Sequence, residues 1–141
     1  MLKLFFALIS LSTILLSANL QWNSDYKKAL QDAKMQNKDV YMLITSESCR
    51  WCRKFESTTL QDKSVIKRLK KKYILLHVDR DKNSFPSMFK AKRVPRHYFV
   101  TAKGEVIYSF LGFWEKDDFY SFLNDVNERK LKIKNRKLKI K

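Results

Sequence analysis

The amino-acid sequence predicts an α/β fold in which helices flank a central mixed sheet. Two runs rich in apolar and β-branched residues, 40–44 and 73–78, have the composition of strands buried on both faces. Two further strands, 97–100 and 105–111, are separated only by the residues TAKG, which is typical of a hairpin. Segments of helical periodicity separate and follow these strands. This order predicts a right-handed parallel βαβ unit extended by an antiparallel pair.

The first half of the chain predicts a helix, a strand and a second, bent helix. Ser24 is a suitable N-cap for a helix that carries apolar residues on one face and ends near Asn37. After the strand 40–44, a new helix is expected to begin at about Arg50. Asp62 indicates a bend in it, followed by a helical stretch with Val65, Ile66 and Leu69 on the inner face.

The second half predicts a strand, a hairpin and a final helix. After the strand 73–78, a loop containing Pro86 leads through a possible short helix, 87–92, to the hairpin. Asp117 and Asp118 suit the positive N-terminus of the last helix. The apolar residues of that helix follow helical spacing: Phe119, Phe122, Leu123 and Val126.

Residues 1–18 predict a cleaved secretory signal. Lys3 precedes the apolar stretch Leu4 to Leu16, and small or polar residues follow it. This stretch is shorter than the roughly 20 residues that a membrane-spanning helix needs. Leu16 fits poorly at the position three residues before a cut after Ala18, so an uncleaved membrane anchor is the alternative. We therefore expect an exported, periplasmic protein with one domain at 19–128.

The basic C-terminus, residues 129–141, carries half of the net charge of +16, with eight Lys or Arg and no acidic residue. It contains KLKIK twice, at 130–134 and 137–141. A dense run of like charges usually stays solvated, so a disordered tail is expected. The alternative is weak contact with an anionic surface. Nucleic acid is not an expected partner. Positive charge alone does not identify a target, and an exported protein is separated from the nucleic acid inside the cell.

Both cysteines of the chain, Cys49 and Cys52, lie in one C-x-x-C pair where a buried strand meets a helix. A structural zinc site would need four ligands, and the two histidines, His77 and His97, stand twenty residues apart, unlike finger spacing. A purely structural disulfide between residues this close would constrain little of the unfolded chain. The pair therefore indicates redox chemistry, without a metal or other cofactor.

The segments TSESCRWCRKFE, HVDRD and VPRHYFV together resemble the exported thioredoxin-like proteins of bacteria, over roughly residues 24–127. The resemblance implies a thioredoxin-like fold and a redox-active dithiol. It also implies that Pro95 is a cis-proline packed against the cysteines, and that the backbone of Val94 pairs with an extended substrate segment. Arg96 departs from the pattern, because the family usually has a small hydroxylated residue there, and this departure bears on the choice of substrate.

The position of each cysteine predicts its role. A thiolate, and not a thiol, attacks a disulfide. Cys49 lies at the start of a helix, where the helix dipole and unpaired N–H groups favour negative charge. The nearby cations Arg50, Arg53 and Lys54 act in the same direction. We expect Cys49 to attack and Cys52, one turn later, to resolve the mixed disulfide.

Other residues are candidates for assisting roles. Thioredoxin has a buried carboxylate six residues before its first cysteine, where this chain has Leu43. Glu56, four residues after Cys52 on the same helix face, is a candidate proton acceptor, and an exposed helix carboxylate is the alternative reading. Trp51, between the cysteines, is a candidate for contact with a partner. Histidines in strands are more often structural, and this is expected of His77 and His97.

These observations predict a monomeric thiol:disulfide oxidoreductase. Its partners would be protein thiols or disulfides and a redox protein that recharges the dithiol. The alternative is a non-enzymatic thioredoxin-like binding module, or a thiol protein that handles metal or haem-pathway substrates. The sequence leaves the direction of electron flow open.

Overall fold

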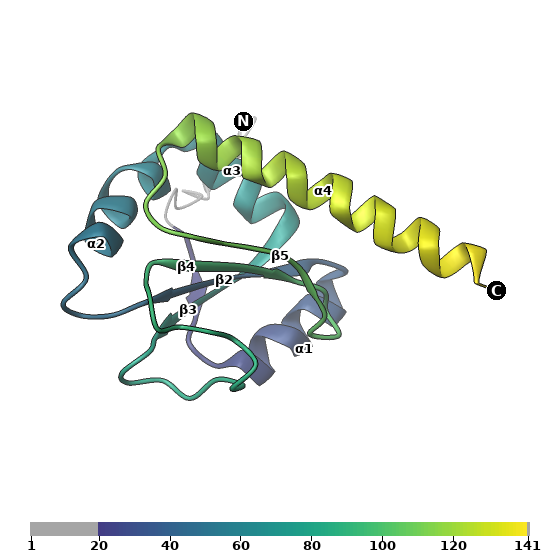
Figure 1. Ribbon diagram of the computed structural model, residues 1–141, viewed down its shortest axis with the longest axis horizontal. Coiled ribbons are helices and arrows are strands. Elements are labelled where there is room, and N and C mark those ends of the chain that lie inside the picture. Colours follow the sequence, from purple (N-terminus) through teal and green to yellow (C-terminus); the bar gives the residue numbers. More distant parts are fainter. Residues whose placement is uncertain (1–19, 141) are drawn as a thin grey trace, which may run out of the picture.

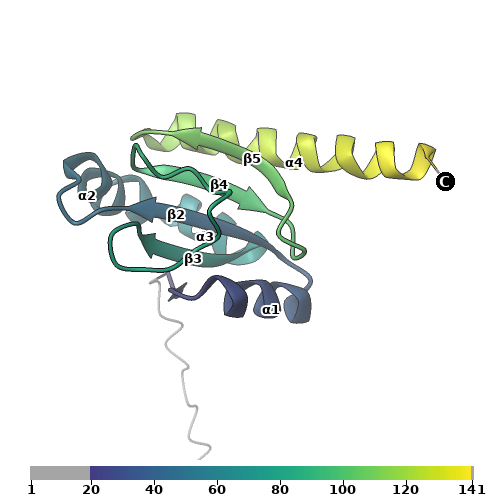
Figure 2. The ribbon, with the colours of Figure 1, turned by 60° about the horizontal axis from the view of Figure 1, so that its bottom comes forward.

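The computed structural model describes residues 20–140, so the expected signal at 1–18 lies outside the described residues. The fold has three layers (Figures 1 and 2). A five-stranded sheet forms the middle layer, with helix α1 on one face and helices α2, α3 and α4 on the other. The predicted α/β architecture, a mixed sheet flanked by helices, is confirmed.

The elements follow one another in the predicted order, with one additional strand at the beginning. The helices are α1 (Tyr26–Gln36), α2 (Arg50–Ser57), α3 (Lys63–Lys72) and α4 (Lys116–Lys139), with a short 3-10 turn, η1 (Thr59–Gln61), between α2 and α3. The strands are β1 (Trp22–Asn23), β2 (Asp39–Thr45), β3 (Tyr73–Asp79), β4 (Arg96–Val100) and β5 (Val106–Leu111).

The sheet has the order β1-β3-β2-β4-β5. Strands β1 and β2 pair with β3 in parallel, whereas β4 runs antiparallel to both β2 and β5. Leu43 at the centre of β2 is paired with His77 on one side and His97 on the other. Since paired residues project to the same face, this register brings both histidines beside the position where thioredoxin has its carboxylate.

Alternate residues of the central strands supply two separate cores. Tyr41 and Leu43 of β2 face α2, α3 and α4, where they pack among aromatic residues such as Phe55 and Phe119. Val40, Met42 and Ile44 face α1 and the β3–β4 loop, where they pack among Ala29, Ala33 and Phe89. Burial on both faces explains why β2 has almost no polar residue between its ends.

Helix boundaries follow local capping. The N-cap of α1 is Asp25 and not the expected Ser24, because the Asp25 carboxylate accepts the Lys28 N–H at 2.7 Å. The helix ends as expected at Asn37, which has a left-handed backbone. At the predicted bend, the Asp62 carboxylate caps α3 by accepting the N–H groups of Ser64 and Val65.

The β3–β4 loop differs from the prediction, because residues 87–92 form turns and bends and not a short helix. Tertiary contacts replace helical hydrogen bonds in this segment. The Tyr98 hydroxyl bonds both backbone groups of Lys90, at 2.9 and 3.1 Å, and Arg80 donates to the carbonyls of Ala91 and Lys92. The buried Phe89 ring anchors the loop on the core.

The basic C-terminus also differs from the prediction, because α4 continues as a helix to Lys139. Its cations find partners far away in the sequence. Lys130 Nζ lies 2.6 Å from the Asp39 carboxylate and Lys137 Nζ 2.8 Å from that of Glu105, while Ile133 packs against the core. The prediction of disorder was based on repulsion between like charges in this segment, and these contacts offset that repulsion. Within residues 20–140, no helix is long and apolar enough to cross a bilayer.

Candidate active site

The two cysteines lie where the chain leaves β2 and enters α2. Cys49 is the N-cap of α2, and its Sγ accepts the backbone N–H of Cys52 at 3.1 Å. The two sulfur atoms form a disulfide with an S–S distance of 2.22 Å. Cys49 is half-buried, whereas Cys52 is only 2% exposed. Cys49 is therefore the more exposed residue of the pair and Cys52 the shielded one.

The aromatic ring of Trp51 binds two of the cations beside the disulfide. Trp51 is 48% exposed and stacks on Phe113, with 5.8 Å between the ring centroids. Arg50 and Lys54 each lie 5.4 Å from the Trp51 ring centroid, and Lys54 lies 4.7 Å from that of Phe113. These cation–π contacts keep positive charge at the rim of the disulfide.

The Val94–Pro95 peptide is cis, and the Pro95 carbonyl accepts the Gly112 N–H at 2.8 Å. The paired part of β4 begins at Arg96, so Val94 lies just before the sheet ladder. The Arg96 side chain crosses the ring of Tyr98 and donates weakly to Ser109 at 3.4 Å. Its buried Nε has no hydrogen-bond partner among the described residues.

Two hydrogen bonds determine the protonation of His97, which is fully buried. The Gly112 carbonyl, 2.9 Å from Nε2, can only accept, so Nε2 carries the hydrogen. Nδ1 then accepts the Tyr41 hydroxyl at 2.9 Å. Burial lowers the pKa of His97 to about 3; the bond to Gly112 opposes this shift and the charge of Arg96 adds to it. A neutral imidazole therefore connects β2 and β4 beneath α2, the structural role expected of it.

Glu56 reaches back toward β3 from the same helix as the cysteines. Its Oε1 lies 3.2 Å from His77 Nε2, which also lies 2.8 Å from the Thr45 hydroxyl. Burial raises the pKa of Tyr41 well above its ordinary value, and the negative charge of Glu56 adds to this shift. The Glu56 carboxylate therefore affects a buried hydroxyl as well as His77. Both Glu56 and His77 keep about a third of their side-chain surface exposed, which gives them access to water.

The structure adds two polar residues, Tyr41 and Thr45, that the sequence analysis did not single out. Both lie two residues from Leu43 on β2, so all three point to the same face. Leu43 occupies the position of thioredoxin's buried carboxylate, and Tyr41 and Thr45 are polar residues on either side of it. This pattern in the sequence could have identified both residues. Among residues 20–140, no group of three or more His, Cys, Asp or Glu side chains is placed to hold a metal ion.

Comparison with known proteins identifies the family. Residues 26–127 match the family described as a thioredoxin-like domain, which covers well over half of the chain. The chain belongs to the thioredoxin-like domain family. No curated protein sequence matches it significantly.

Solved structures of the thioredoxin-like family superpose on the chain at low sequence identity. A DsbH oxidoreductase is 23% identical, with a TM-score of 0.62 over 77% of this chain and 84% of its own. A thioredoxin from Thermus thermophilus is 21% identical, with a TM-score of 0.63 over 76% and 86%. The oxidised C-terminal domain of Neisseria meningitidis DsbD is 19% identical, with a TM-score of 0.60 over 74% and 97%. These likenesses show the shared fold.

A thioredoxin-like domain with a C-x-x-C disulfide at a helix N-terminus has, at the level of the family, the arrangement of a thiol–disulfide oxidoreductase. The sequence-based interpretation is confirmed to this extent.

Proposed function

We propose that the protein is an exported thiol:disulfide oxidoreductase that exchanges disulfides with protein thiols through Cys49 and Cys52. The position of the Cys49 sulfur supports this proposal. The sulfur is accessible, caps α2 and accepts the Cys52 N–H, so a thiolate at this position would be stabilised by the helix terminus. In a non-enzymatic binding module, nothing would require this stabilisation.

In the first step, the Cys49 thiolate of the reduced protein attacks one sulfur of a substrate disulfide. A Cys49–substrate mixed disulfide forms, and the other substrate sulfur leaves as a thiolate. Trp51 and its bound cations provide an exposed surface for the substrate beside this sulfur. The backbone of Val94 pairs with an extended substrate segment just before the β4 ladder, and the cis-proline Pro95 lies beside it.

In the second step, the Cys52 thiol loses its proton and its sulfur attacks Cys49. The substrate leaves as a second thiolate, so two electrons pass from the dithiol to the substrate and the Cys49–Cys52 disulfide forms. Glu56 accepts the proton, directly or through a water, while His77 and Thr45 position its carboxylate. The same steps in reverse oxidise a substrate dithiol, and a redox partner restores the starting state.

The reactivity of the two thiols as a function of pH tests the proposed function. We expect the reduced Cys52→Ser variant, which keeps Cys49, to react rapidly with iodoacetamide and to titrate below the ordinary cysteine pKa near 8.5. The reduced Cys49→Ser variant should react slowly, because Cys52 is only 2% exposed. Equal and slow alkylation of both, with ordinary titration, would contradict the proposal and favour the binding module.

The Glu56→Gln variant tests the second step separately. Attack by Cys49 should keep its rate, while release of the mixed disulfide by Cys52 should slow by about tenfold to a hundredfold, since a positioned base is lost. Stopped-flow measurement with a peptide disulfide separates the two steps. Glu105→Gln is a matched control, because Glu105 is also ion-paired but with Lys137 on α4. Equal slowing in both variants would remove Glu56 from the mechanism.

A further inference from the structure

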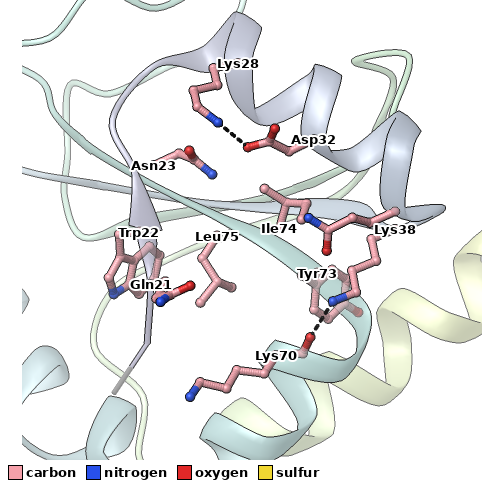
Figure 3. Close-up of a pocket in the computed structure, with 11 residues that line it drawn as sticks. Gln21, Trp22, Asn23, Lys28, Asp32, Lys38, Lys70, Tyr73, Ile74 and Leu75 are labelled. Carbon is pink, nitrogen blue, oxygen red and sulfur yellow. Dashed lines mark hydrogen bonds and ion pairs between the residues drawn. The ribbon is translucent and has the colours of Figure 1, made fainter. Parts of the chain in front are cut away.

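Two neighbouring hollows are lined by none of the candidate site residues Cys49, Trp51, Cys52, Glu56, Val94 and Pro95. The first, of about 500 Å³, is bordered by β1, the start of β3 and α1 (Figure 3). The second, of about 570 Å³, lies between the end of α3, the start of β2 and α4. Lys38 and Tyr73 line both hollows, so the two form one continuous surface.

This surface, which we term the lysine face, is strongly positive. Seven lysines line the two hollows: Lys28, Lys38, Lys70, Lys71, Lys72, Lys130 and Lys134. Among residues 20–140, Asp32 and Asp39 are the only acidic residues that line them. Each carboxylate is already paired with one lysine, Asp32 with Lys28 at 2.7 Å and Asp39 with Lys130 at 2.6 Å. The local excess is thus 7 − 2 = 5 positive charges.

Hydrogen bonds within the lysine face fix the ammonium groups of Lys38 and Lys72. Lys38 Nζ donates to the Lys70 carbonyl at 2.8 Å, as Figure 3 shows, and Lys72 Nζ donates to the Asn127 amide oxygen at 3.4 Å. The first of these bonds joins the end of α1 to the end of α3, and the second joins α3 to α4. The fold therefore gathers lysines from three helices, and their mutual repulsion favours an anionic ligand.

Exposed apolar side chains continue from the same surface along α4. Leu131 lines the second hollow and is 60% exposed, and Leu138, seven residues later, is 63% exposed. A spacing of seven places both leucines on one side of the helix, with Lys134 beside them. Figures 1 and 2 show that this part of α4 extends beyond the rest of the domain. Leucines next to lysines on a projecting helix are typical of contact with a lipid surface.

We propose that the lysine face and the Leu131–Leu138 side of α4 bind the surface of a membrane that contains anionic phospholipids. Lysines contact the phosphate groups, and the two leucines enter the boundary between headgroups and acyl chains. This binding is separate from disulfide exchange, because it uses none of the residues around the disulfide. The sequence analysis gave contact between the basic C-terminus and an anionic surface as an alternative. The proposal assigns that contact to named residues.

Co-sedimentation of the full chain with lipid vesicles tests the proposal. We expect binding to vesicles of phosphatidylglycerol mixed with phosphatidylcholine, little binding to phosphatidylcholine alone, and loss of binding as salt rises. The Lys71→Glu/Lys72→Glu variant should bind about tenfold more weakly or worse. Lys27→Glu/Lys103→Glu is the matched control, since it makes the same change in net charge at exposed lysines that line neither hollow.

A second variant separates lipid from a soluble anion. Leu131→Gln/Leu138→Gln keeps both charge and helix propensity, and it should weaken vesicle binding severalfold. Met88→Gln is its control, because Met88 is 59% exposed elsewhere. Equal binding to neutral vesicles would overturn the proposal, as would unchanged binding by either double variant. Stronger displacement by inorganic phosphate than by sodium chloride at the same ionic strength would also overturn it, because the lysine face would then be a site for soluble anions.

Discussion

Replacing Cys49 with serine will abolish disulfide exchange, whereas replacing Cys52 will leave a protein that attacks its substrate and then stalls. Without Cys49, only the buried sulfur of Cys52 remains, and the exchange rate should fall by at least about a hundredfold. Without Cys52, the mixed disulfide loses its intramolecular nucleophile, whose effective concentration exceeds that of an external thiol by several orders of magnitude. The stalled species should therefore persist for isolation.

Non-reducing electrophoresis and intact mass spectrometry with a peptide disulfide as substrate measure this difference. The Cys52→Ser variant should gain the mass of one substrate thiol, and dithiothreitol should remove it. The Cys49→Ser variant is the control and should gain none. If both variants accumulated the adduct equally, the two sulfurs would have interchangeable roles, contrary to the burial of Cys52 and the exposure of Cys49.

The buried His97 should make the fold unstable in acid. Its pKa is about 3 in the folded protein, first because of burial, and about 6.5 in the unfolded chain. Below pH 6.5 the unfolded chain takes up a proton at His97 and the folded protein does not, so stability present above pH 6.5 is lost as pH falls toward 3. The loss from this group alone amounts to at most about 5 kcal/mol.

Urea unfolding at a series of pH values measures this effect. The His97→Gln variant removes the titration, while the glutamine amide can donate to the Gly112 carbonyl and accept from Tyr41. Its stability should be lower at neutral pH and fall less steeply in acid. His77→Gln, at a histidine with about a third of its side chain exposed, is the control and should keep the steep fall. If His97→Gln lost stability in acid as steeply as the unmodified protein, another group would be responsible.

The parts of the fold that the sequence predicted correctly are those with a strong local signal. The apolar runs of β2 and β3 and the spacing of the hairpin produced the right strands and the right order. Strand β1 was not predicted, because its two residues, Trp22 and Asn23, are too few to show any periodicity. The expected helix at 87–92 was wrong because contacts with Tyr98 and Arg80, which are not local, determine that loop.

In the candidate site, too, features with a local sequence signal were predicted and contacts between distant residues were not. The positions of Cys49 and Cys52 at the strand–helix junction followed from the C-x-x-C spacing and the flanking periodicity. The chain of contacts from Glu56 to His77 and on to Thr45 did not, because His77 and Thr45 come from different strands and meet only through the sheet register. Likewise, Phe113 stacks on Trp51 from the segment that follows β5, 62 residues later in the chain, and no local pattern encodes this contact.

The ion pair between Lys130 and Asp39 has a consequence for any shortened version of this protein. Asp39 opens the central strand with only 8% of its surface exposed, and its charge is balanced by a residue 91 positions later. Cutting the chain at residue 127, where the family match ends, would remove Lys130 and with it the ion pair of this shielded carboxylate, which is costly. We therefore expect a chain that ends at residue 127 to be less stable than the full chain, because Lys130 and Ile133 contact the domain from beyond the family match.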